Sequence, residues 1–137
     1  MKAINITLVF DGETEAAFNF YKSIFGGEFM HVQRMKEMPN APEMPSAEGD
    51  KILHIAYPIG STILMGMDAP TGRMVINKGN NFMVTLDTSR EEETTHIFNG
   101  LSAGGAVIMP IAHQFWGAFF GMVTDKFGIQ WMLSYVK

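Results

Sequence analysis

The sequence contains no cysteine, and this absence removes several kinds of chemistry at once. Disulfides, thiolate nucleophiles and cysteine-based zinc or iron–sulfur sites are all excluded. A chain without cysteine also suits a reducing compartment, so we expect a cytoplasmic protein.

Basic side chains and long apolar runs are scarce as well. Ten Lys and Arg stand against fourteen Asp and Glu, for a net charge of −4, and no Lys/Arg block occurs. Since nucleic-acid binding requires clustered positive charge, we expect no nucleic-acid partner. No stretch approaches the ~20 apolar residues of a membrane span. The first apolar segment is interrupted by Asn5 and Thr7 and followed by DGETE, so we expect neither a signal peptide nor a membrane partner.

The sequence does have enough apolar residues for a core, together with an internal repeat. Its 137 residues, 47% of them apolar, predict a single globular domain over residues 1–137. Asn5 and Asp11 enclose a strand-like segment that recurs between Asn81 and Asp87. An acidic stretch, a helical pattern and a Gly-Gly pair follow in both places. We therefore predict two repeated modules, at about residues 1–70 and 78–137.

Each half predicts a strand, a helix and three further strands. In the first strand Ile4, Ile6, Leu8 and Phe10 alternate with Asn5, Thr7 and Val9, so they should face the helix. The first helix is expected over residues 13–25, and the second is expected to begin with a capping box of Ser89 and Glu92. The region 36–50 contains three prolines and predicts a long loop. The first strand of the second half is expected at 81–87, and the later strands at 28–34, 51–58, 61–67, 106–110, 117–124 and 129–136.

Three stretches carry a resemblance to a known superfamily: FDGETEAAFNFYKSIFGGEF (10–29), ILHIAYPIGSTILMGMD (52–68) and FWGAFFGMVTDKFGIQWMLSY (115–135). They resemble the vicinal oxygen chelate superfamily of glyoxalase I, bleomycin-resistance proteins and extradiol dioxygenases, and its PhnB-like branch in particular. Lys126 departs from the family, which often has proline there. The resemblance implies an α+β fold in which two paired βαβββ modules form a half-barrel sheet around a cavity, with the helices outside. It also implies a homodimer.

The resemblance further implies where a metal ion would be held. Metal-dependent members place ligands on the first and last strand of each module, and these positions correspond here to Asn5, Leu64, Asn81 and Met132. None of the four is a His or a carboxylate, the ligands that such an ion requires. We therefore expect no metal and no cofactor, and neither glyoxalase I nor extradiol dioxygenase chemistry.

Strand alternation predicts which side chains line the cavity. They are largely apolar, methionine-rich and neutral, which favours binding of a small, largely apolar molecule. Thr62 and Leu64 are expected on this face too. The candidate substrate-binding residues are Asn5, Thr7, His54, Asn81, Met83, Trp116, Met122, Gln130 and Met132.

Several alternatives stay open at this point, including whether the chain is an enzyme. His54 could be the general base of a metal-independent isomerase, lyase or epimerase, or it could be a structural residue. A metal-dependent lyase or dioxygenase requires a different strand register. Trp116 fits a pocket and a dimer interface equally well. Among the other candidates, His113 is expected in a loop, His31 and His96 on the surface, and Asp11, Asp87 and Asp125 in caps and turns.

Overall fold

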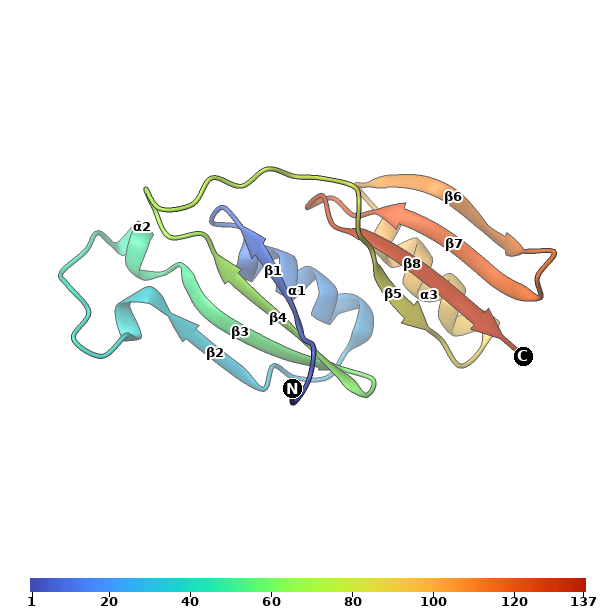
Figure 1. Cartoon of the computed structure of the whole chain (residues 1–137), viewed down its shortest axis with the longest axis horizontal. Coiled ribbons are helices and arrows are strands. Elements are labelled where there is room, and N and C mark those ends of the chain that lie inside the picture. The colour runs from blue at the N-terminus through green and yellow to red at the C-terminus, as the bar shows by residue number, and fades with distance from the viewer. The chain divides into compact units, whose positions relative to one another are not determined.

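The computed structural model describes residues 1–137, which divide into two compact units, Met1–Asn77 and Lys78–Lys137 (Figure 1). Unit 1 contains β1 (Ile6–Phe10), α1 (Thr14–Phe25), β2 (His31–Arg34), the 3-10 helix η1 (Met35–Glu37), α2 (Ser46–Gly49), β3 (Ile52–Ile59) and β4 (Thr62–Asp68). Unit 2 contains β5 (Val84–Asp87), α3 (Glu91–Ser102), β6 (Ala106–His113), β7 (Ala118–Thr124) and β8 (Gln130–Val136).

The sheets of the two units have the same topology. The strand orders are β1-β4-β3-β2 and β5-β8-β7-β6. In each sheet the first strand pairs in parallel with the last, and the remaining pairs are antiparallel. Each unit is therefore a βαβββ module, and the α+β class expected from the sequence is confirmed. A duplication and a single domain over residues 1–137 stay predictions.

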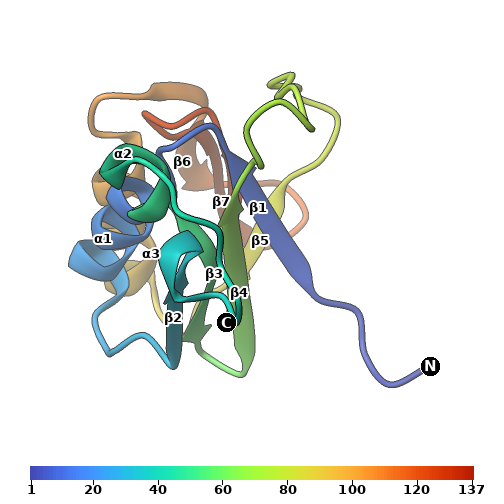
Figure 2. The same ribbon diagram turned by 90° about the vertical axis from the view of Figure 1, so that its left-hand side faces the viewer.

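In unit 1 the amphipathic helix α1 packs on one face of the sheet, which Figure 2 shows from the side. Ala17, Phe18 and Tyr21 are fully buried there. The ring of Phe18 lies so close to β4 that a Cβ atom added to Gly66 would come within 2.4 Å of it. Glycine at this position is thus what allows the helix to approach the sheet.

In unit 2, α3 covers one face of the sheet in the same way. Its buried residues Ile97, Phe98 and Leu101 lie on the side of the sheet where Trp131 and Leu133 have no exposed surface. Leu8 and Phe10 in β1 are buried on the helix side of the sheet, as their alternation predicted, and so is Val84 in β5. The expectation is wrong for Ile4, which precedes β1 and is 83% exposed, and Ile6 at the start of β1 is 40% exposed. No helix in the structure is long and apolar enough to cross a membrane.

Two buried carboxylates connect neighbouring segments. The Asp68 carboxylate at the end of β4 accepts hydrogen bonds from the Thr14 backbone N–H (3.1 Å) and hydroxyl (2.6 Å), and from the Ile52 N–H (2.8 Å). The Asp125 carboxylate accepts from the N–H groups of Phe127 (2.8 Å) and Ile129 (3.1 Å) and from the indole of Trp131 (2.8 Å). Both groups are satisfied by donors that hold the chain in place, so their roles are structural.

Several element boundaries differ from expectation. β5 is shorter than predicted, and Asn81 and Met83 precede it, as Asn5 precedes β1. The capping box at Ser89 and Glu92 is wrong: the N-cap residue of α3 is Arg90, and the Glu93 carboxylate accepts the Ser89 N–H at 2.8 Å.

The region 36–50 and β6 also differ from expectation. The region contains part of η1 and the one-turn helix α2. Pro45 immediately precedes α2, a position where a missing N–H costs no helical hydrogen bond. β6 continues through Pro110 to His113, which an edge strand permits.

Candidate functional site

The sheet of each unit has one face that its helix does not cover, here called the open face. In unit 1, Thr7 pairs with Met65 and Val9 with Met67 across β1 and β4, and Met65 pairs with Ala56 of β3. These residues alternate with the buried side chains that face α1. The open face of unit 1 is formed by Thr7, Val9, His31, Gln33, His54, Ala56, Met65 and Met67.

The expectation that Thr62 and Leu64 belong to this face is wrong. Leu64 is 5% exposed and pairs with the fully buried Tyr57, on the side covered by α1. Thr62 has the same parity as Leu64 and so also lies on that side, although it is solvent-exposed. The register error arose because β4 has large apolar residues at both parities, so its pattern does not distinguish the two faces. Met65 and Met67, which were not among the predicted site residues, occupy the open face instead.

His54 lies half-buried on the open face, as its position in the strand predicted. Its ring is beside that of His31 on the adjacent strand, with centroids 5.3 Å apart and planes tilted by 45°. Neither imidazole has a hydrogen-bond or ion-pair partner in the chain. The structure thus brings together two histidines that the sequence separates by 23 positions.

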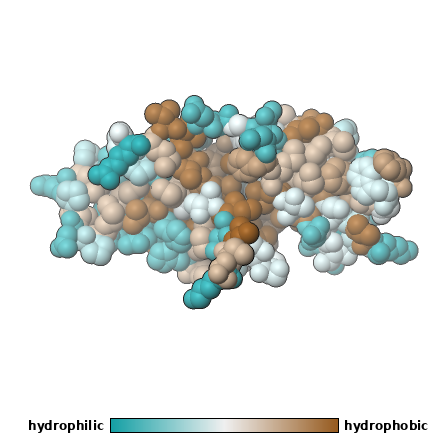
Figure 3. All heavy atoms as spheres, in the orientation of Figure 1, coloured by the Kyte–Doolittle hydropathy of each residue, from teal (hydrophilic) through white to brown (hydrophobic).

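The open face of unit 2 carries a row of methionines. Met132 of β8 pairs with Thr85 on one side and with Met122 on the other, and Met122 pairs with Met109 of β6. All three methionines are half-buried, and the Thr85 hydroxyl lies 3.9 Å from the Met132 sulfur. Gln130 and Ser134 add neutral polar groups on the same face of β8. In Figure 3, brown apolar and pale residues cover much of the surface in the part of the view where Figure 1 draws β7 and β8.

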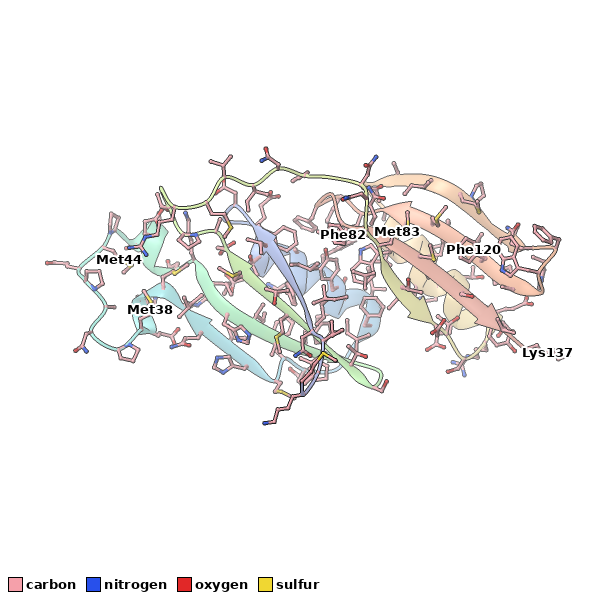
Figure 4. All side chains as sticks on the ribbon, in the orientation of Figure 1. Met38, Met44, Phe82, Met83, Phe120 and Lys137 are labelled. Atoms are coloured by element: carbon pink, nitrogen blue, oxygen red, sulfur yellow. The ribbon has the colours of Figure 1, made fainter.

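Trp116 lies at one end of this open face. Its ring makes an edge contact with Phe120, at a centroid distance of 5.4 Å, and Figure 4 marks Phe120 on β7. Phe115 packs against Trp116 in turn. Trp116 is 51% exposed and Phe115 is 97% exposed, so both rings are available to a ligand or to a partner.

His113 lies at the end of β6, not in a loop, and it points to the other side of the sheet. Its Nε2 atom is 3.1 Å from Oε1 of Glu91, and its ring packs on Phe119. A cavity of about 440 Å³ lies here, lined by Arg90, Glu91, Glu92, His113, Gly117, Phe119, Tyr135 and Lys137. None of the predicted substrate-binding residues lines this cavity.

Asn5 and Asn81 are exposed and lie outside the strands, and Met83 is half-buried just before β5. Asp87 is not in a cap. It is the last residue of β5, opposite Ser134 on the open face of unit 2. Met109 was missed because its strand was predicted to end at Pro110, and a short strand next to a proline gave little reason to assign a face.

The residues at the metal-ligand positions do not fit a divalent ion. With the register corrected, the open-face pairs on the first and last strands are Thr7–Met65 and Val9–Met67 in unit 1, and Thr85–Met132 and Asp87–Ser134 in unit 2. Asp87 is the one carboxylate among them, and the other side chains offer hydroxyl, thioether or aliphatic groups instead of the imidazole and carboxylate ligands that such ions prefer. Neither unit contains a group of three or more His, Asp or Glu residues able to hold a metal.

Comparison with known proteins yields one family and several close structures. The family model described as 3-demethylubiquinone-9 3-methyltransferase matches residues 2–134. Protein YjdN of Escherichia coli K12 is 32% identical over 139 residues, which cover 95% of this chain and 92% of that protein.

Two solved structures are similar over almost the whole chain. PA1353 from Pseudomonas aeruginosa is 31% identical with a TM-score of 0.84, and the match covers 98% of each chain. A Bacillus cereus protein described as a putative 3-demethylubiquinone-9 3-methyltransferase, PhnB protein, is 27% identical with a TM-score of 0.77, covering 98% of this chain and 100% of that one.

Proposed function

Because the chain belongs to the family described as 3-demethylubiquinone-9 3-methyltransferase, a PhnB-like branch of the glyoxalase/bleomycin resistance/dioxygenase superfamily, we propose that it binds a small, largely apolar molecule. The ligand contacts the open face of unit 2, and the protein acts as a homodimer. Binding uses no metal ion at the superfamily's ligand positions.

The observation that carries this proposal is the row of Met109, Met122 and Met132 across three adjacent strands. Covering a methionine side chain is worth about 1.5–3 kcal/mol when it is fully removed from water. The unbranched thioether also adapts to ligands of different shape. Thr85, Gln130 and Ser134 supply the few neutral hydrogen-bonding groups that orient a ligand in an apolar site.

The chemistry of the open faces also argues against reactions that pass through a metal-bound substrate. Thr7, Met65, Thr85 and Met132 lie on the open faces of the first and last strands, and none of them is a ligand that such an ion prefers. Methyl transfer, which the family description names, has no support either. β1 is followed by DGETE and β5 by TSREE, and neither is the glycine-rich turn that binds a dinucleotide-type cofactor.

Titration with the neutral apolar dye Nile red tests the proposal directly. We expect saturable binding that the Met132→Lys variant weakens at least about tenfold, because a lysine would place a charge within the methionine row. Met74→Lys is the matched control, since Met74 is exposed in the linker outside the strands. Equal affinity of both variants, or no saturable binding, would contradict the proposal.

The homodimer is proposed from the exposed rings of Phe115 and Trp116, since exposed aromatic clusters are common in interfaces. Sedimentation equilibrium should give twice the chain mass of 15.2 kDa, and Phe115→Ser should shift the equilibrium toward the monomer. A monomer at every concentration would refute the dimer but leave the ligand proposal standing.

A second function, a metal-independent isomerase, lyase or epimerase, is favoured by one observation. The imidazole of His54 is half-buried on the open face and no residue of the chain bonds to it, so it could accept a substrate proton. NMR in D2O with a panel of 2-oxo and 2-hydroxy acids would reveal exchange at carbon. Under this alternative His54→Gln abolishes the exchange. Under the binding proposal no exchange occurs, and the variant binds Nile red within about twofold of the original.

A further inference from the structure

We propose that His31 and His54 form a binding site for a late first-row transition metal ion, copper above all, on the open face of unit 1. The two imidazoles are the principal ligands. Gln33 and Met67 lie beside them on the same face and complete the site. This site is independent of the apolar ligand proposed for unit 2.

The strand register brings the two imidazoles together. Gln33 pairs with His54 and His31 with Ala56 across β2 and β3, so the histidines are diagonal neighbours on one face of an antiparallel pair. Their ring centroids are 5.3 Å apart. Two nitrogens that bind one ion at about 2.0–2.1 Å lie roughly 3–4 Å apart. Small rotations of two partly exposed rings at this spacing bring their nitrogens into that range.

The electrostatic surroundings permit a cation. The open face of unit 1 contains no Lys or Arg among its eight residues. The nearest cation along the strand, Arg34, is turned to the other side, where it bonds to the Glu15 carboxylate of α1 and to the Asp50 carbonyl. The hydrogen bonds that Arg34 donates to the Glu15 carboxylate raise the pKa of Arg34. The guanidinium therefore stays charged and bound to the helix, away from the histidines.

The ligand types select the ion. The region has no carboxylate, which argues against Mg²⁺ and Ca²⁺, whereas imidazole suits zinc, nickel and copper. In the sequence of β4, Met67 comes directly after Gly66, the partner of Ile55, and two residues after Met65. Met67 therefore has the same parity as Met65 and lies on the open face with His54. A thioether is a soft ligand that favours copper, and copper also leads the general affinity order of divalent ions.

The pair is distinct from the positions that the superfamily uses. Those positions lie on the first and last strands of the module, where unit 1 has Thr7 and Met65. His31 and His54 lie instead on β2 and β3, the two strands at the other edge of the sheet. The unsuitability of Thr7 and Met65 as metal ligands is therefore compatible with metal binding at His31 and His54.

Calorimetric titration of the untagged protein with Cu²⁺, Ni²⁺ and Zn²⁺, in a buffer that does not bind metals, tests the proposal. We expect one site that binds Cu²⁺ most tightly, and lower affinity at lower pH because protons compete for the imidazoles. His31→Gln and His54→Gln should each weaken Cu²⁺ binding at least about tenfold. The two substitutions together should cost little more than either alone, since one lost ligand already disrupts the pair.

His96→Gln is the matched control, because His96 is an exposed histidine on α3 that packs against no other histidine. It should leave Cu²⁺ affinity within about twofold. Zn²⁺ titration followed by ¹⁵N NMR provides a second readout, in which the imidazole signals of His31 and His54 should shift while those of His96 and His113 stay in place. Full Cu²⁺ affinity in His31→Gln, or shifts confined to other histidines, would overturn the proposal.

Discussion

Asp125→Asn should destabilise the protein strongly, although the two side chains have nearly the same size. Asp125 is 3% exposed, and its Oδ2 atom accepts the indole N–H of the fully buried Trp131 at 2.8 Å. The Oδ1 of asparagine can still accept the N–H groups of Phe127 and Ile129. Its NH2 group then faces the Trp131 N–H, so two donors meet where water does not reach.

The expected decrease in the free energy of unfolding has two contributions, the lost hydrogen bond and the unpaired indole donor. A hydrogen bond to a charged group contributes about 1.5–3 kcal/mol, and a buried donor left without an acceptor costs about 1–3 kcal/mol more. Replacing a buried carboxylate with a neutral amide recovers some desolvation energy. We therefore expect a decrease of about 3 kcal/mol in the free energy of unfolding. This is a large share of the roughly 5–15 kcal/mol that stabilises a domain.

Urea unfolding followed by far-ultraviolet circular dichroism measures the effect. Asp11→Asn is the control: Asp11 is exposed, and its replacement should change the unfolding free energy by less than about 0.5 kcal/mol. In Asp125→Asn/Trp131→Phe the opposing indole donor is absent, so the double variant should lose less than the sum of the single variants. Additivity within about 0.5 kcal/mol, or a stable Asp125→Asn variant, would refute the reasoning.

Three further predictions concern the packing and the strand register. Gly66→Ala should cost about 1–3 kcal/mol, because the added methyl would lie 2.4 Å from the buried ring of Phe18; urea unfolding measures it, and a neutral result would show that α1 can move away. Leu64→Gln should lower the free energy of unfolding by about 2 kcal/mol or more, whereas Met65→Gln should change it little. Thermal melts measure both variants, and a larger loss in Met65→Gln would indicate that Leu64, not Met65, lies on the open face. Burial raises the pKa of Tyr57 above its usual 10.0, so folding keeps its phenol protonated. The resulting stability is complete below pH 10 and declines as the pH rises above it. In Tyr57→Phe the free energy of unfolding should therefore fall less as the pH rises above 10, although this variant loses the hydrogen bond to the Gly26 carbonyl. If the free energy of unfolding of both proteins has the same pH dependence, Tyr57 does not cause the alkaline loss of stability.

Local sequence patterns predicted most of the fold. The strict alternation in β1 placed Leu8 and Phe10 toward the helix, and both are buried. The order of strands and helices, the α+β class and the resemblance to PhnB-like proteins were also correct. Asp125 was expected in a turn and is found in one. These features depend on residues near one another in the chain, where backbone geometry and side-chain alternation act directly.

The candidate site was only partly predictable, and β4 shows why. Ile63, Leu64, Met65 and Met67 are all apolar, so hydrophobicity could not decide which of them faces α1. The parallel register with β1 decides it by pairing Thr7 with Met65. His31 was likewise expected only as a surface residue, and the diagonal contact with His54 depends on how β2 pairs with β3.

By itself, then, the sequence determined the succession of elements and carried the resemblance to the family. The succession of elements follows from residue types and short-range periodicity, and the family follows from the resemblance of three stretches to known motifs. Only the tertiary structure decided which side of β4 is open and which side chains are neighbours across strands. Hydrogen bonding between strands distant in the sequence sets this register, and a shift of one residue exchanges the two faces.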